Sequence, residues 1–199
     1  MLTVRAAARF EGALRDLVTA AKDEGRHDVG VVLAALLGQV LSTVLLGDPV
    51  VREVLRRGGV VHVVPVPTSG PARRRRGGDP VGDLARRAVA AVRGPPPDDR
   101  AALVVTHALR HVRRVADQSR LTRVQRHDNL HGALAVRPRL AGLLAGATVV
   151  LVDDVVTTGA TLGEAARALR AVGVVHVTAA TVATTPPRPG VSRTPPGPR

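Results

Sequence analysis

One stretch near the C-terminus constrains the fold more than any other part of the chain. The apolar run Val149–Val152 predicts a strand buried on both faces, as in a parallel sheet. Two carboxylates, Asp153 and Asp154, follow where we expect that strand to end, and a loop rich in Thr and Gly then leads into a helical pattern. Because ligands of open α/β sheets bind at the carboxyl ends of the strands, the stretch predicts an α/β domain with its ligand site here.

The loop after the two acids has the composition of a phosphate-binding loop. Three threonines offer hydroxyls, and Gly159 allows backbone N–H groups to turn inward without a Cβ in the way. The helix that we expect to begin near Thr161 points its positive N-terminus at the same place. Asp153 and Asp154 can accept hydrogen bonds from sugar hydroxyls or bind a divalent metal. The pattern therefore favours a phosphorylated sugar as the ligand.

Two other interpretations of this stretch compete with a phosphate site. Receiver domains of phosphorelays also place paired acids after an apolar strand, but their pair closes the first strand and no Thr-Thr-Gly loop follows. The sequence Thr161-Leu-Gly-Glu164 also has the form of a capping box, in which the two end residues satisfy helix N–H groups reciprocally. We expect that cap to form, but it does not explain two acids at a strand end.

The string from Asp153 to Thr161 resembles the phosphoribosyl-pyrophosphate (PRPP) loop of type I phosphoribosyltransferases. Further motifs narrow the resemblance to the ComF-like branch, which is associated with competence and DNA uptake. They are Val64–Pro67, Arg76-Gly77, Gln118–Arg123 and Asn129–Gly132. The resemblance covers residues 5 to 184. It implies an α/β fold whose central, mainly parallel sheet has about five strands flanked by helices, with an N-terminal helical segment and a mobile lid.

The resemblance also implies roles for the residues at the strand end. The PRPP-binding residues are Asp153, Asp154, Thr157, Thr158, Gly159, Ala160 and Thr161. The loop threonines would bind the 5′-phosphate, while the two acids would take the ribose 2′- and 3′-hydroxyls. The cofactor is Mg²⁺, which the same acids would hold indirectly, through ribose hydroxyls or water.

Other implied roles lie in two earlier segments. The loop Pro65, Val66 and Pro67 would meet the pyrophosphate of PRPP. Residues 110–128 correspond to the mobile lid, in which Arg113 and Arg114 are the candidate catalytic residues that neutralise departing pyrophosphate. Lid closure would exclude water from the reacting sugar. The acceptor would be a nucleobase or amine nitrogen that attacks C1 of the ribose.

The chain departs from the family pattern in three ways. Purine-salvage relatives have an acid where this chain has Thr157, which argues against hypoxanthine-guanine transfer and leaves an orotate-like pattern or no acceptor chemistry. ComF-like proteins usually have an aromatic or apolar residue and Asn where Gly78-Asp79 stand. The four-cysteine zinc module of many ComF-like proteins is missing, because the chain has no cysteine. Phe10 is the only aromatic residue, so no aromatic platform for a base is expected.

The charge leaves a second class of function open. A net charge of +13 predicts an anionic partner such as PRPP, pyrophosphate or nucleic acid, although an arginine-rich genome would produce part of the same excess. The basic run Arg73–Arg76 is either a solvated face or an attractor of such anions. The alternative to an enzyme is a non-catalytic, competence-related module that senses PRPP or handles DNA.

Hydrophobic periodicity and breakers divide the chain into elements. Helices are predicted at 5–24, at 29–46, from Asp79-Pro80 with an apolar stripe of Val81, Leu84, Ala88 and Val92, and at 162–172 up to Gly173. Strands are predicted at 60–66, 102–107, 131–137, 148–153 and 174–183. We expect one domain over 1–184, with an N-terminal helical part over 1–58, and a disordered Pro/Arg-rich tail over 185–199.

The N-terminal part of the sequence indicates where in the cell the protein is found. Residues Val29 to Leu46 carry no charge, but glycines and polar residues dilute the run, so we expect a core helix and not a membrane span. Arg5 and Arg9 precede any apolar run, which argues against a secretory signal and favours a cytoplasmic protein. The sequence leaves open whether the protein forms a homodimer.

The histidines divide into two groups. His62 and His176 lie in strand patterns and are predicted to be packed or edge residues. The others surround the lid segment with no metal spacing and are not assigned a role; they are His107, His111, His127 and His131.

Overall fold

Five parallel strands form the central sheet of the computed structural model, which describes residues 2–23, 27–70, 73–74, 78–93, 102–113 and 130–185. Their spatial order is β1-β7-β6-β2-β3, and every neighbouring pair runs parallel. The strands are β1 (Val4–Arg9), β2 (Val60–Pro65), β3 (Ala102–Val105), β6 (Thr148–Val156) and β7 (His176–Thr184). The predicted α/β fold with a mainly parallel sheet flanked by helices is confirmed.

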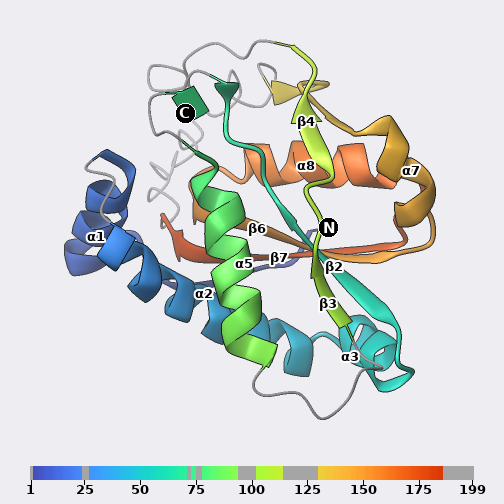
Figure 1. Ribbon diagram of the computed structural model, residues 1–199, viewed down its shortest axis with the longest axis horizontal. Coiled ribbons are helices and arrows are strands. Elements are labelled where there is room, and N and C mark those ends of the chain that lie inside the picture. Colours follow the sequence, from blue (N-terminus) through green and yellow to red (C-terminus); the bar gives the residue numbers. More distant parts are fainter. Residues whose placement is uncertain are drawn as a thin grey trace, which may run out of the picture.

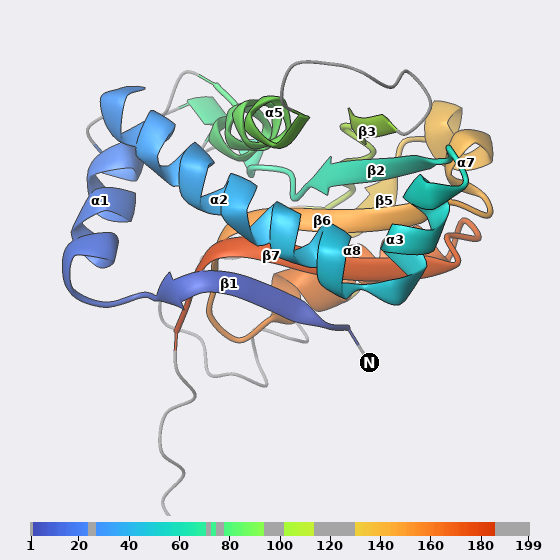
Figure 2. The same ribbon diagram turned by 90° about the horizontal axis from the view of Figure 1, so that it is seen from below.

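Helices cover both faces of this sheet (Figure 1). One face carries α1 (Gly12–Asp23), α2 (His27–Gly47), α3 (Pro49–Arg56) and α5 (Pro80–Arg93). The other face carries α7 (Pro138–Leu144) and α8 (Ala160–Arg170). Figure 2 shows the strands in their sheet order, with α2 crossing in front of them and α8 behind. Such a three-layer arrangement buries the sheet on both sides, as the apolar strand sequences require.

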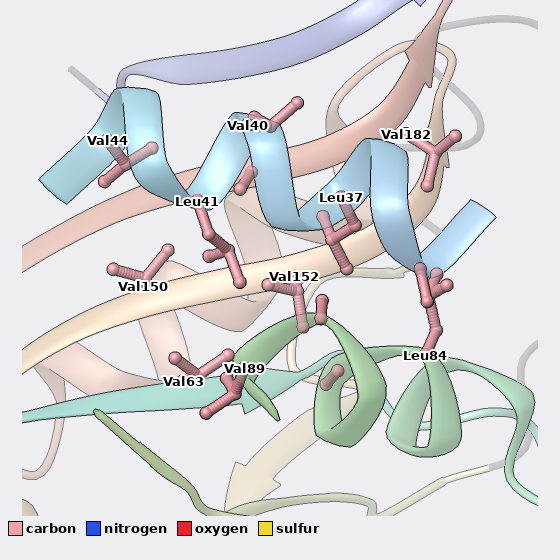
Figure 3. Packing of buried hydrophobic residues seen from close by; sticks show 14 of the residues in the cluster. Leu37, Val40, Leu41, Val44, Val63, Leu84, Val89, Val150, Val152 and Val182 are labelled. Atoms are coloured by element: carbon pink, nitrogen blue, oxygen red, sulfur yellow. The ribbon is translucent and has the colours of Figure 1, made fainter. Parts of the chain in front are cut away.

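The two faces divide the core into two clusters. Val150 and Val152 of β6 pack with the helices on the α2 side, while Val149 and Leu151 pack with α8. This is the strand alternation that sends successive side chains to opposite faces. On the α2 side, Leu37, Val40, Leu41 and Val44 point toward the strands, and Leu84 and Val89 of α5 join them (Figure 3).

Helix α2 contributes more buried residues to that cluster than any other element. The side chains of Leu37, Leu41 and Val44 are fully buried, so the prediction that this helix contributes to the core is confirmed. Val31, Val32 and Leu46 lie on its outer side and are exposed. Within the described ranges it is also the one helix long and apolar enough to cross a membrane by length and composition alone, a test that core helices also pass.

The predicted N-terminal helix over 5–24 is wrong in its first part. Val4–Arg9 forms strand β1, which pairs with β7 from Val4↔Ala179 to Arg9↔Thr184, and the helix begins only at Gly12. The alanines of this segment suit a helix, but β7 would otherwise present an open edge of backbone N–H and C=O groups. Pairing with that edge outweighs the local preference. The N-terminal part over 1–58 is therefore not wholly helical.

The segment predicted as a strand over 131–137 contains β5 (Leu134–Val136), but this strand does not join the central sheet. It pairs antiparallel with β4 (Leu109–His111) in a separate two-stranded sheet. Leu109, Leu134 and Val136 pack into the cluster on the α8 side. The first residues of the predicted lid, Arg110 and His111, belong to β4. Residues 114–129 lie outside the described residues, as does the predicted tail beyond Thr185.

Candidate active site

The predicted phosphate and pyrophosphate segments meet at the carboxyl edge of the sheet. Strands β2 and β6 are neighbours, with Pro65 in register with Val152. The amide of Val66 donates to the Val152 carbonyl at 2.9 Å. The loop that leaves β2 and the acids that follow Val152 therefore emerge side by side, at the strand spacing of about 4.8 Å.

Asp153 and Asp154 lie inside β6, which is longer than predicted. The strand pairs with β2 only as far as Val152, but it continues beside β7 to Val156↔Thr184. Beyond Val152, β6 has lost its neighbour on the β2 side, and both acids are partly exposed. Asp153 Oδ1 accepts from the Asp154 amide at 2.9 Å, and Asp154 Oδ1 accepts from the Val155 amide at 2.6 Å. These bonds fix the carboxylates close to the backbone at the edge.

The loop after β6 turns at a glycine. Gly159 has φ +75°, the left-handed region that an L side chain rarely adopts. Thr158 Oγ1 accepts from the Ala160 amide at 3.3 Å, which satisfies one N–H at the start of α8. Thr185 fastens the loop to the end of β7, since its amide donates to the Val156 carbonyl and its hydroxyl to the Thr157 carbonyl. The loop thus presents the N-terminus of α8 at the strand end, as predicted.

The predicted capping box between Thr161 and Glu164 is wrong. Gly159 is the N-cap residue of α8, and it has no side chain with which to cap the helix. Glu164 is buried, and its Oε1 accepts from the amide of Leu134 in β5 at 3.1 Å. Its carboxylate also accepts two bonds from the Arg167 guanidinium, at 2.7 and 2.8 Å. A buried carboxylate needs partners, and here they lie in the next turn and in β5 instead of at the helix start.

This ion pair shifts the ionisation of both partners. Burial alone would raise the pKa of Glu164, but the hydrogen bonds from Arg167 and from the Leu134 amide outweigh it, and the pKa is lowered. The bond to Glu164 raises the pKa of Arg167. Arg167 also donates to the Leu134 carbonyl at 3.2 Å, so α8 is fastened to the two-stranded sheet at both backbone groups of Leu134. Helix α8 thereby connects the loop Thr157–Gly159 to the two-stranded sheet of β4 and β5.

The loop after β2 is held by residues distant in the sequence. His111 Nε2 lies 3.0 Å from the Pro67 carbonyl, and Thr68 Oγ1 lies 3.3 Å from Asp79 Oδ1. Asp79 also accepts from the Gly82 amide at 3.3 Å, which confirms it as the cap of α5. At the far end of the loop, Arg73 donates its amide to the Ser69 carbonyl. Arg73 and Arg74 are exposed here, while Arg75-Arg76 and Gly77 lie outside the described residues.

Several of the described histidine side chains have partners in the protein. His62 is buried, with Nδ1 2.9 Å from Thr106 Oγ1, and burial lowers its pKa. His176 Nε2 lies 3.0 Å from Asp48 Oδ2. Both are packed residues, as predicted. His107, to which the sequence assigns no role, lies 3.4 Å from Asp79 Oδ2. No spacing along the chain reveals such contacts, because the partners lie far apart in the sequence, 44 residues for His62 and 128 for His176.

Of the two candidate lid arginines, the structure describes Arg113 but not Arg114. The Arg113 guanidinium donates to the His131 carbonyl at 2.8 Å, a contact that joins the start of the predicted lid to the residues that follow it. Arg114 lies outside the described residues, as do Gln118–Arg123, Asn129 and His127. Their predicted roles therefore stay predictions.

Comparison with known proteins identifies a family for most of the chain. The family model "Phosphoribosyl transferase domain" matches residues 30–196. No curated protein sequence matches the chain. A solved structure titled "Structure of the allosteric regulatory enzyme of purine biosynthesis" is similar at 19% identity and a TM-score of 0.41, over 77% of this chain and 26% of that chain. This chain therefore spans about a quarter of that protein's length.

Proposed function

This chain belongs to the phosphoribosyl transferase domain family, and we propose that it binds PRPP with Mg²⁺ and transfers the phosphoribosyl group to a nitrogen nucleophile, with release of pyrophosphate. The observation that carries the proposal is the edge shared by β6 and β2, where Asp153 and Asp154 lie beside the end of β2 at Pro65. Together with the motifs quoted above, this favours the ComF-like branch of the family.

The two loops fit the two ends of PRPP. That molecule carries a phosphate on C5 and a pyrophosphate on C1, so its binding needs two anion sites with sugar ligands between them. The loop Thr157–Thr161 and the N-terminus of α8 supply one anion site. The loop Pro65–Gly70 supplies the other, from the neighbouring strand. Asp153 and Asp154 lie at the edge between these loops and would accept hydrogen bonds from the ribose hydroxyls.

The residues also fit a shared magnesium ion. Within the described ranges, no cluster of three or more His, Cys, Asp or Glu side chains could enclose a metal ion. Mg²⁺ does not need such a cage, because it is usually bound by one or two carboxylates together with substrate phosphates and water. Asp153 and Asp154 would hold it through ribose hydroxyls or water. When bound, Mg²⁺ would offset the charge that develops on the departing pyrophosphate.

In the proposed transfer, the nitrogen lone pair forms a bond to C1 while the bond from C1 to the pyrophosphate oxygen breaks. The electrons of that bond leave with pyrophosphate, and the nitrogen then loses a proton to solvent. Arg113 and Arg114 would close over the departing group with the lid. Phe10, the only aromatic residue, packs against the core on the α2 side. An acceptor held by stacking is thus disfavoured, which favours an amine or a base held by hydrogen bonds.

The test is pyrophosphate release from Mg-PRPP in the presence of a panel of amines and nucleobases. We expect release that depends on both Mg²⁺ and one acceptor, and that is lost when the site acids are replaced. Binding of Mg-PRPP without release across the whole panel would indicate a sensor of PRPP instead of a transferase.

A second candidate is a DNA-handling module, which the net charge of +13 favours. Such a charge should attract DNA without specificity at low ionic strength. If transfer is the function, DNA affinity should fall by about 10³–10⁵ between 50 and 200 mM salt, while PRPP binding falls less, because directed donors and a metal are screened less. DNA binding that stays submicromolar at the higher salt, without pyrophosphate release, would favour the second candidate.

A further inference from the structure

The loop Pro65–Gly70, called here the pyrophosphate loop, carries contacts that neither the family match nor the sequence motifs assign. We infer that His111 and Asp79 are positioning residues of this loop: His111 sets the orientation of the Pro67–Thr68 peptide, and Asp79 sets the Thr68 hydroxyl. The inference rests on the proposed function, because the group thus presented is the anion site for the pyrophosphate of PRPP.

The first contact fixes a peptide plane. His111 Nε2 lies 3.0 Å from the Pro67 carbonyl oxygen. A carbonyl only accepts, so Nε2 must carry the proton in this contact. The peptide is trans, as are all peptides in the described part of the chain, and its N–H points opposite to its C=O. Holding the Pro67 carbonyl toward β4 therefore directs the Thr68 N–H away from it, and N–H groups are what a phosphate binds.

The second contact fixes the next side chain. Thr68 Oγ1 donates to Asp79 Oδ1 at 3.3 Å, while Asp79 Oδ2 lies 3.4 Å from His107 Nδ1. His107 Nε2 lies 2.9 Å from the Arg86 guanidinium. A guanidinium only donates, so Nε2 accepts and the His107 proton resides on Nδ1, facing Asp79. Asp79 is thus held from two sides while it accepts from Thr68.

Gly82 allows this arrangement. A Cβ at this position would lie 2.5 Å from His107 Cε1 and 2.6 Å from Asp79 Oδ2. Any larger residue must therefore displace His107, Asp79 or both. Gly78 lies just before Asp79 in the chain, and a Cβ added there would meet nothing within 4 Å. Gly82→Ala and Gly78→Ala therefore form a matched pair that differs in whether it disturbs Asp79.

The experiment combines one measurement without ligand and two with ligands. Amide hydrogen exchange over the pyrophosphate loop is compared for wild type, His111→Leu, His111→Gln, Gly82→Ala and Gly78→Ala. Affinities of the same proteins are then measured for Mg-pyrophosphate and for ribose 5-phosphate. Gln retains an N–H donor for the Pro67 carbonyl, whereas Leu does not.

We expect faster exchange in the loop for His111→Leu and Gly82→Ala, with Mg-pyrophosphate affinity reduced about tenfold, the loss expected for one hydrogen bond. Ribose 5-phosphate affinity should stay within about twofold in each of these proteins, because it depends on the other loop. His111→Gln and Gly78→Ala should resemble wild type in all three measurements.

Unchanged loop exchange in His111→Leu would overturn the inference, as would faster exchange with unchanged Mg-pyrophosphate affinity. Equal losses for Mg-pyrophosphate and ribose 5-phosphate would also overturn it, by showing a general structural effect. A wild-type protein that binds neither ligand would overturn the proposed function itself, while the exchange data would still decide whether His111 holds the loop.

Discussion

The two loops at the carboxyl edge of the sheet differ in how far along the chain their main hydrogen-bond partners lie. The phosphate loop, Thr157–Thr161, is turned by its own residues: Thr158 accepts from the Ala160 amide two residues on, and Gly159 supplies the left-handed turn. One distant residue, Thr185, donates to the Thr157 carbonyl. The pyrophosphate loop depends on residues 11 and 44 positions away, at Asp79 and His111. One proposed anion site is thus encoded mainly by a contiguous motif, while the other is assembled by the fold.

The largest effect is expected from the acids next to the locally encoded loop. The double change Asp153→Asn with Asp154→Asn should weaken Mg-PRPP binding by about a hundredfold or more, since each lost charge-assisted hydrogen bond is worth about 1.5–3 kcal/mol. Folding should change far less, because both side chains are partly exposed at the strand edge. Calorimetric titration checks the affinity, and urea unfolding checks stability. Glu53→Gln, an exposed charge change on α3, is the control. Wild-type affinity in the double variant would show that the acids are not sugar ligands.

A second prediction tests the distant support of the phosphate loop's helix. Glu164→Gln should lower the free energy of unfolding by about 1–3 kcal/mol, the range for a buried group that loses a charged partner. The effect should be below that of a fully buried pair, because the Arg167 side chain is 42% exposed. Urea unfolding measures the change in stability. The control is Glu53→Gln, which should change stability little because the ion pairs of Glu53 are exposed.

The same residue predicts a pH dependence with a definite sign. The pKa of Glu164 is lowered from its ordinary value of 4.5 in the folded protein. The unfolded chain therefore binds the proton first as the pH falls, and the stabilisation is complete above pH 4.5 and lost below it, toward the folded pKa. The difference in stability between wild type and Glu164→Gln should shrink over that window. A difference that stays constant from about pH 7 to about pH 3 would contradict the role assigned to the ion pair.

The smallest predicted effects come from two glycines of the same helix start. Gly159→Ala should destabilise the fold by about 1–2 kcal/mol, because the left-handed backbone conformation is energetically unfavourable for alanine. Gly163→Ala should stabilise it by up to about 1 kcal/mol, because this position is helical and exposed with open space around it. Thermal unfolding of both variants measures the opposite signs. Equal signs would show that the turn at Gly159 does not need its φ of +75°.

Features with a local signal are predictable from the sequence, while those with a distant partner are not. The acid pair, the loop after it and the apolar strands all follow from contiguous residues. Helix α3 is absent from the predicted elements although Asp48-Pro49 repeats the start signal found at Asp79-Pro80: Asp48 accepts from the amides of Val50 and Val51. The same start signal, applied at both positions, predicts this helix as well.

Other features could not be predicted from the chain alone. β1 forms a strand because β7 offers an open edge, and that edge exists only in the folded sheet. Glu164 has the sequence context of a helix cap, yet burial against Leu134 of β5 gives it another role. The contact of His111 with Pro67 follows from the positions of β2 and β4, which no spacing encodes.

The proposed function requires that the edge shared by β2 and β6 binds PRPP with Mg²⁺. Titration of the wild-type protein with Mg-PRPP tests it most directly. We expect saturable binding of one PRPP per chain, competition by both ribose 5-phosphate and Mg-pyrophosphate, and stabilisation by about 2.7 kcal/mol at a hundredfold excess over Kd. An absence of binding heat together with an unmoved melting temperature at millimolar Mg-PRPP would contradict it.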